Sequence, residues 1–144
     1  MAAYDNMSNL NRLARSIHNA NKLKGFDVTT ASIGQTLMLV VSELAEALEA
    51  DRNGKERGML SVFERDLDCA RLKTSDFEGD NENCAWLKNR FETTIKDTFE
   101  DEIADTFIRL LDLCGGLGID IEKHIELKLR YNATRSFKHG NKKY

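Results

Sequence analysis

The chain has 144 residues, a net charge of −3 and no proline. This length suits one domain, and a chain without proline lacks the residue that most reliably interrupts helices. The slightly acidic balance argues against a nucleic-acid-binding protein, which normally carries a clear basic excess. Three cysteines without metal-ligand spacing indicate free thiols in a reducing compartment. The first residues lack the apolar run of a signal peptide, and the longest apolar run, residues 37–41, is too short to span a bilayer, so we expect a soluble cytoplasmic protein.

The N-terminal part of the chain predicts two helices. From residue 6 to residue 24 apolar side chains recur at helical spacing, and Gly25 ends this pattern. A second helix is expected over residues 33–51, with N-cap candidates at residues 29–32 and a turn at residues 53–54.

The rest of the chain alternates helical patterns with polar or glycine-containing breaks. In chain order these are a weak helix at 56–73, a loop at 74–83, one long helix or two at 83–113, and a last helix at 121–136. Gly115 and Gly116 are expected to end the long stretch, and Asp120 is expected to cap the last helix. Because no alternating pattern is long enough to build a sheet, the predicted fold class is all-α.

Two of the predicted helices each carry a pair of carboxylates three residues apart. Glu43 and Glu46 share a face of the helix at 33–51, and Glu102 and Asp105 share a face of a later helix. If these helices pack together, they present four oxygen ligands to one or more hard cations such as Mg²⁺, which usually keeps waters and shares substrate phosphates. The pattern therefore predicts a site for phosphoryl chemistry.

The surroundings of the two pairs differ. No Lys or Arg occurs between Lys24 and Arg52, and Glu43 and Glu46 lie where the core of an otherwise apolar helix is expected. Buried carboxylates are costly unless they are paired, protonated or bound to a metal, so a metal is the simplest explanation. Taken alone, the second pair would be assigned to the surface. The expected core stripe of its helix is Ile103, Phe107, Leu110 and Cys114, and the polar stripe continues through Arg109 and Asp112.

The ordered set of motifs resembles the MazG-like all-α nucleoside triphosphate pyrophosphohydrolases. An ExxE on one helix precedes an ExxD on a later helix, within the sequences ELAEALE from residue 43 and DEIADT from residue 101. The similarity continues into the last helix and into Lys138-His139-Gly140. The resemblance implies a single domain over residues 1–144, with a four-helix-bundle-type MazG-like core and a basic tail at about 137–144.

The spacing between the two carboxylate pairs departs from the family pattern. Between Glu46 and Glu102 lie 55 residues, which is about twice or more the usual separation. We therefore interpret residues 52–96 as an insertion with at least one extra helix, which caps the site, builds a subunit interface or has no specific role. Trp86 lies in this insertion, where we expect it to anchor the insertion to the core through buried area rather than to stack on a base.

The resemblance also implies a reaction: hydrolysis between the α and β phosphates of a nucleoside triphosphate, giving a monophosphate and pyrophosphate, in keeping with nucleotide-pool cleansing. Mg²⁺, or Mn²⁺ in its place, would be held by Glu43, Glu46, Glu102 and Asp105. The ion would neutralise phosphate charge and activate water. Glu46 or Glu49 would act as the general base, and the sequence leaves that choice open.

Other polar residues are candidates for holding the nucleotide. Lys128, Asn132 and Arg135 lie at spacings of four and three, on one face of the last predicted helix, where they can grip phosphates. Cations at the end of a helix are also favoured by its dipole without any ligand. Base recognition is assigned to the N-terminal part, with the candidates His18, Asn21, Phe26 and Gln35.

Other functional classes fit the sequence less well. A di-iron protein needs Glu-x-x-His on two helices, but the residues three before the histidines are Arg15, Ile121 and Ser136. A catalytically inactive helical interaction module that retains the family fold would be expected to have lost a ligand, yet all four carboxylates are present. Only the basic tail suggests a DNA-associated protein. We expect a homodimer or homotetramer, with no membrane partner and no stable nucleic-acid binding.

Overall fold

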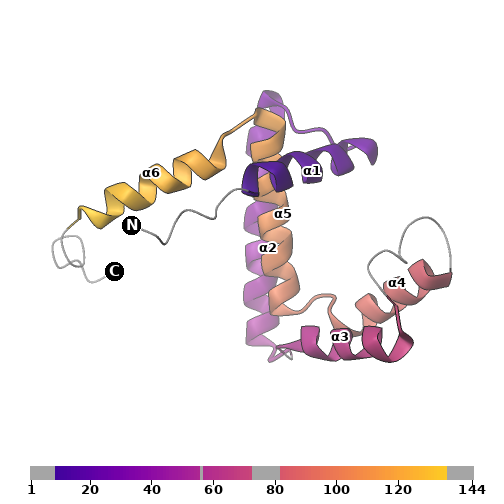
Figure 1. Ribbon diagram of the computed structural model, residues 1–144. Coiled ribbons are helices and arrows are strands. Elements are labelled where there is room, and N and C mark those ends of the chain that lie inside the picture. The colour runs from indigo at the N-terminus through magenta and orange to yellow at the C-terminus, as the bar shows by residue number, and fades with distance from the viewer. Residues whose placement is uncertain (1–8, 56, 73–81, 136–144) are drawn as a thin grey trace. The chain divides into compact units, whose positions relative to one another are not determined.

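The computed structural model describes residues 9–55, 57–72 and 82–135, and all regular structure in these ranges is helical (Figure 1). The helices are α1 (Leu10–Leu23), α2 (Ile33–Arg52), α3 (Met59–Ala70), α4 (Glu82–Thr94), α5 (Phe99–Leu117) and α6 (Ile121–Ala133), with a 3-10 turn at Thr30–Ser32. The predicted all-α class is thereby confirmed. Most of the loop expected at 74–83, and all of the tail at 137–144, lie outside the described residues.

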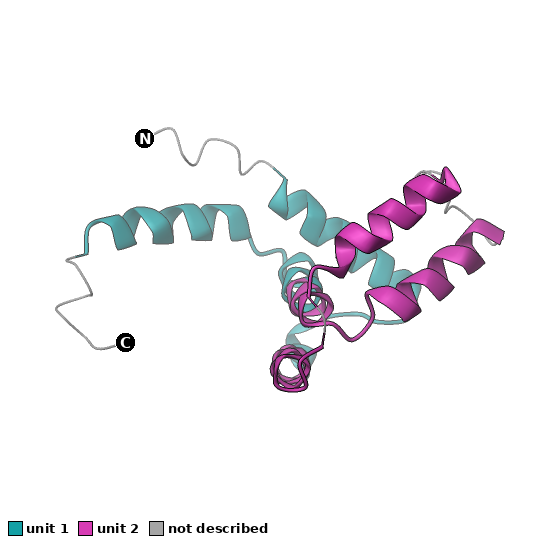
Figure 2. Ribbon diagram, turned by 90° about the horizontal axis from the view of Figure 1, so that it is seen from below, with its two compact units in different colours: residues 1–37, 108–144 teal, residues 38–107 magenta. Residues whose placement is uncertain are grey.

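The chain divides into two compact units (Figure 2). Unit 1 comprises residues 1–37 and 108–144, and unit 2 comprises residues 38–107. Helices α1 and α6 therefore belong to unit 1 and helices α3 and α4 to unit 2, while α2 and α5 contribute residues to both.

Several helix ends follow the local signals in the sequence. Thr29 forms a capping box with Ser32 at the turn that leads into α2, and the backbone N–H of Thr29 donates to Ser32 Oγ at 2.9 Å. Asp120 caps α6, because its Oδ1 accepts from the backbone N–H of Lys123 at 3.0 Å. Gly25 follows α1 with a φ of 89°, a backbone conformation that glycine adopts without steric cost. These N-cap and stop predictions are confirmed.

The expected helical stretch at 83–113 is two helices, and the second runs further than predicted. Residues 95–98 separate α4 from α5, which continues through Gly115 and Gly116 to Leu117. A Cβ at Gly115 would lie 2.9 Å from His18 Cβ and still closer to the backbone of Ala14. The two glycines therefore allow α1 to approach α5, rather than ending the helix, since both adopt ordinary helical dihedrals.

In unit 1, Asn11 joins the start of α1 to the start of α6. Its side-chain amide donates to Asp120 Oδ1 at 2.7 Å, and its backbone N–H donates to Glu122 Oε1 at 3.0 Å. The Asn11 bond and the Lys123 backbone N–H hold the pKa of the exposed Asp120 carboxyl below its usual range. The polar contacts thus fix two helix N-termini together.

In unit 2, helices α3 and α4 form a hairpin with its own small core. Phe63 is buried, and its ring centroid lies 6.4 Å from that of Trp86 and 6.3 Å from that of Phe91, the latter in an edge-to-face arrangement. Arg90 Nε donates to Asp66 Oδ2 at 2.6 Å beside this cluster. Trp86 therefore packs within the sequence segment interpreted as an insertion.

Helices α2 and α5 bury faces with few bulky apolar side chains. The buried positions of α2 in unit 2 are Val40, Glu43, Ala47 and Ala50. On α5, Glu102, Thr106 and Asp112 are buried together with the larger apolar Leu111 and Leu113, whereas Phe107 is 61 % exposed and Leu110 is also exposed. The prediction that Phe107 and Leu110 form the core stripe is therefore wrong, because α5 is turned with its carboxylate and threonine side chains inward.

Helix α2 and the turn before it pass a length-and-composition test for a membrane span. The segment Thr30–Arg52 has 23 residues and a window of mean hydropathy 1.2, of which 22 % is buried. Its longest uninterrupted apolar run, residues 37–41, is short, so run length alone did not predict a membrane span there. Core helices of soluble proteins also pass such a test, so the cytoplasmic location stays a prediction.

Candidate metal centre

Three carboxylates from α2 and α5 meet in unit 2. One oxygen each from Glu43, Glu102 and Asp105 lies within 4.8 Å of the others. Glu43 is 6 % exposed and Glu102 is 5 % exposed, and Asp105 is half-buried. The structure thus brings Glu43 of the ExxE pair next to Glu102 and Asp105 of the ExxD pair. The sequence alone showed only that the two pairs lie on separate helices.

The positions of Glu43 and Glu102 on their helices bring both side chains into the cluster. Glu43 lies on the buried stripe of α2, where spacings of three and four align it with Val40 and Ala47. Glu102 lies in the first turn of α5, and its backbone N–H donates to the carbonyl oxygen of Thr98 at 3.1 Å. The positive end of the α5 dipole is therefore close to the cluster, which partly offsets the cost of burying carboxylates.

The electrostatics of the cluster raise the pKa of Glu102 from 4.5 to about 7. Burial contributes most to this increase, followed by repulsion from Glu46, Asp101, Glu43 and Asp105. Near neutral pH the group is consequently divided between its protonated and ionised forms. A divalent cation among these oxygens would remove the repulsion that holds the proton on Glu102.

The donor set fits a hard divalent cation. All three ligating groups are carboxylates, with no thiol or imidazole among them, which suits Mg²⁺ or Mn²⁺ better than zinc. Mg²⁺ usually takes only a few protein carboxylates and leaves other positions to water and substrate phosphate. Glu43, Glu102 and Asp105 are the residues that would hold it.

Glu46 and Glu49 lie outside this group of three. Glu46 is exposed and accepts a hydrogen bond from Ser42 Oγ at 3.2 Å, so the prediction that it occupies a core position is wrong. It nevertheless exerts the largest charge effect on Glu102. Glu49 is also exposed and accepts from Asn53 Nδ2 at 3.2 Å.

Two of the base-recognition candidates belong to a polar network in unit 1. His18 Nδ1 lies 2.9 Å from Asp112 Oδ1, and Asn21 Nδ2 donates to Asp112 Oδ2 at 2.7 Å. Asp112 is buried, so its assignment to a solvated polar stripe is wrong. In the sequence, the nearby Gly115 and Gly116 were the feature that could have indicated close packing of another helix against this part of α5. The other candidates, Phe26 and Gln35, are exposed.

The phosphate-binding candidates lie at the end of α6 in unit 1. Lys128 Nζ is 5.2 Å from the centroid of the Tyr131 ring, and Arg135 Cζ is 5.9 Å from it. Asn132 is exposed in the last turn of α6. The helix ends at Ala133, so Arg135 lies in the following turn rather than on the predicted helix extending to residue 136.

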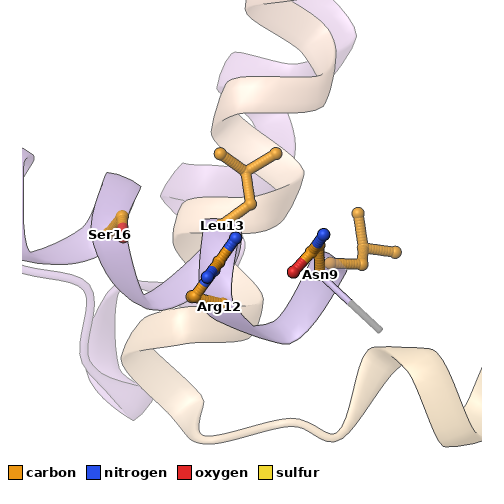
Figure 3. A pocket seen from close by; sticks show the side chains of 5 residues that line it. Asn9, Arg12, Leu13 and Ser16 are labelled. Carbon is orange, nitrogen blue, oxygen red and sulfur yellow. The ribbon is translucent and has the colours of Figure 1, made fainter. Parts of the chain in front are cut away.

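Hollows on the described surface contain few of the predicted residues. An open hollow of about 340 Å³ along α1 is lined by Asn9, Leu10, Arg12, Leu13 and Ser16 (Figure 3). All five side chains come from successive turns at the start of one helix, and none is a predicted site residue. Another, of about 370 Å³, lies on α6 and includes Lys128.

No family model matches this chain, and no curated protein or solved structure matches it. Membership of the MazG-like family therefore stays a prediction from the sequence motifs.

Proposed function

We propose that this chain is a Mg²⁺-dependent nucleotide pyrophosphohydrolase that cleaves a nucleoside triphosphate between its α and β phosphates, with a MazG-like bundle as its core. The observation that carries the proposal is the meeting of Glu43, Glu102 and Asp105 within 4.8 Å. Glu102 is buried in this group and is repelled by the neighbouring carboxylates, and a divalent cation would relieve that repulsion.

Each acidic residue has a distinct proposed role. Glu43, Glu102 and Asp105 hold the metal, which supplies charge neutralisation and water activation at phosphorus. Glu46 is the better candidate for the general base, because its charge contributes to the raised pKa of Glu102 while its side chain remains accessible to solvent. Glu49 pairs locally with Asn53, which favours a surface role. Mn²⁺ is expected to substitute for Mg²⁺.

The remaining residues singled out in the sequence keep their proposed roles toward the nucleotide. Lys128, Asn132 and Arg135 would bind the phosphates, since all three are exposed and two are cationic. Base recognition would involve His18 and Asn21, whose side chains are oriented by Asp112. The proposal includes a homo-oligomer in the cytoplasm and a role in cleansing the nucleotide pool.

The test is pyrophosphate release from a panel of canonical and modified nucleoside triphosphates, with and without Mg²⁺. We expect Mg²⁺-dependent release that falls about 100-fold or more in Glu102→Gln, the scale of losing one electrostatic group at a reacting centre. Glu64→Gln, a substitution of an exposed glutamate on α3, should retain full activity.

Two negative results have different meanings. Mg²⁺ binding by the folded protein without release from any nucleotide would point to another phosphoanhydride substrate. Absence of both Mg²⁺ binding and release would overturn the proposal in favour of an inactive interaction module.

A further inference from the structure

The carboxylate of Glu102 belongs to the first turn of α5, and the ends of helices open more readily than their centres. The backbone N–H of Glu102 donates to the carbonyl oxygen of Thr98 at 3.1 Å, so the place of this side chain depends on the first turn being formed. The meeting of Glu102 with Glu43 and Asp105 therefore depends on what holds the start of α5.

The segment around the start of α5 supplies a local cap of its own. Thr98 Oγ1 accepts from the backbone N–H of Asp101 at 3.3 Å, and Asp101 Oδ2 accepts from the backbone N–H of Asp97 at 3.0 Å. However, Asp97 has a φ of 60°, a left-handed conformation that a residue with a side chain adopts at an energetic cost. This strain offsets part of the stabilisation that the cap gives to the first turn.

Arg57 and Gly58, within the segment interpreted as an insertion, contact the same turn from outside. The Arg57 guanidinium lies over the Phe99 ring, 4.4 Å from its centroid, and forms an ion pair with Asp51 in the last turn of α2. The backbone N–H of Gly58 donates to Glu100 Oε1 at 3.2 Å. All five residues belong to unit 2. Two consecutive residues therefore bind the start of α5, and one of them also binds the end of α2.

We propose that Arg57 is a positioning residue for the metal site, because it holds the first turn of α5 to the end of α2 and so keeps Glu102 in place to bind a divalent cation. The inference rests on the proposed metal site and gives the insertion a role in it. An exposed ion pair alone adds little to stability. Here the guanidinium also lies on an aromatic ring and the neighbouring N–H binds a carboxylate, so several contacts act on one helical turn.

The experiment measures Mn²⁺ binding to the full chain by electron paramagnetic resonance, without nucleotide and at a temperature where every variant is folded. We expect Arg57→Gln to bind Mn²⁺ about 10-fold more weakly than the wild type, the scale of removing a residue that orients metal ligands. Arg57→Lys retains the positive charge between Asp51 and Phe99, so it should recover most of the affinity.

Arg65→Gln is the matched control for Arg57→Gln. Arg65 is also an exposed arginine of unit 2, and its guanidinium lies 3.7 Å from a carboxylate oxygen of Asp66, on α3. Its Mn²⁺ affinity should equal that of the wild type. An unchanged affinity in Arg57→Gln would overturn the inference, since a residue that only stabilises the fold or only binds substrate phosphate would leave binding of the metal alone unaffected.

Hydrogen exchange of the metal-free protein provides a second readout. The amides of residues 99–103 should exchange about 10-fold faster in Arg57→Gln than in the wild type or Arg65→Gln, because the first turn of α5 opens more often. Equal exchange rates in the three proteins would overturn the inference. A wild type that binds no Mn²⁺ would instead overturn the proposed metal site, and the role of Arg57 there with it.

Discussion

Glu102 couples the burial of α5 to the chemistry of the carboxylate cluster. Its side chain is almost inaccessible, and four other carboxylates repel its negative charge. The proton and a divalent cation are therefore alternative ways of relieving the same unfavourable charge. In the metal-free protein, the unrelieved repulsion on ionised Glu102 should therefore lower the stability of the fold.

In the metal-free protein, we expect the ionisation of Glu102 to lower the free energy of unfolding as the pH rises. Its folded-state pKa of about 7 lies above the unfolded value of 4.5, so between these values the folded protein holds a proton that the unfolded chain has released. The contribution of Glu102 to the free energy of unfolding is therefore greatest below about pH 4.5 and declines until about pH 7. Urea unfolding at several pH values in EDTA would measure it.

Glu102→Gln provides the comparison for this pH dependence. The amide cannot ionise, so the variant should lack the decline, and the two unfolding curves should diverge by an amount on the order of a few kcal/mol between pH 5 and pH 8. Glu64→Gln, at an exposed position on α3, should behave like the wild type. Parallel pH profiles for the wild type and Glu102→Gln would contradict the assignment.

At the scale of elements, the contact between α1 and α5 depends on the absence of a side chain. Gly115 lies against Ala14 and His18, and Gly116 lies against Val28 and His18. Beside them, Asp112 accepts hydrogen bonds from α1 side chains. Close backbone approach and a buried polar network thus occur at the same crossing in unit 1.

Gly115→Ala should destabilise the protein by about 1–3 kcal/mol, the usual range for overpacking. The added methyl group would meet the backbone of Ala14, which cannot move without displacing α1, and this cost exceeds the gain in helix propensity. Thermal or urea unfolding followed by circular dichroism would measure the change.

Gly34→Ala is the matched control for that substitution. Gly34 also lies within a helix, in α2, but a Cβ there would meet nothing within 4 Å. The same substitution should therefore stabilise the protein by up to about 1 kcal/mol. Equal effects at the two positions would show that packing at the α1–α5 contact is not the cause.

At the scale of the whole molecule, the proposed metal site should link Mg²⁺ to global stability. A ligand that binds only the folded state stabilises it by about 2.7 kcal/mol at 100 times its dissociation constant. We therefore expect Mg²⁺ to raise the midpoint of thermal unfolding of the wild type at pH 8. Since Glu43 contributes to the cluster, Glu43→Gln should largely lose this response. An equal Mg²⁺ response in both proteins would exclude the carboxylate cluster as the binding site.

The sequence predicted most helices because their signals are local. Apolar periodicity, the cap at Asp120 and the stop at Gly25 each depend on residues within a few positions of one another. Spacing alone also showed that Glu102 and Asp105 share a helix face. The same local rules failed at Gly115 and Gly116, where a neighbouring helix rather than helix propensity explains the glycines.

The sequence by itself determined the all-α class, the approximate helices and the existence of two carboxylate pairs. Only the tertiary structure decided that Glu43 and Glu102 are buried together, that Glu46 is exposed and that Phe107 faces solvent. Helical periodicity describes two faces of a helix, but which face is buried depends on the partner helix. That choice rests on contacts between residues far apart in the chain, such as the contact between His18 and Asp112.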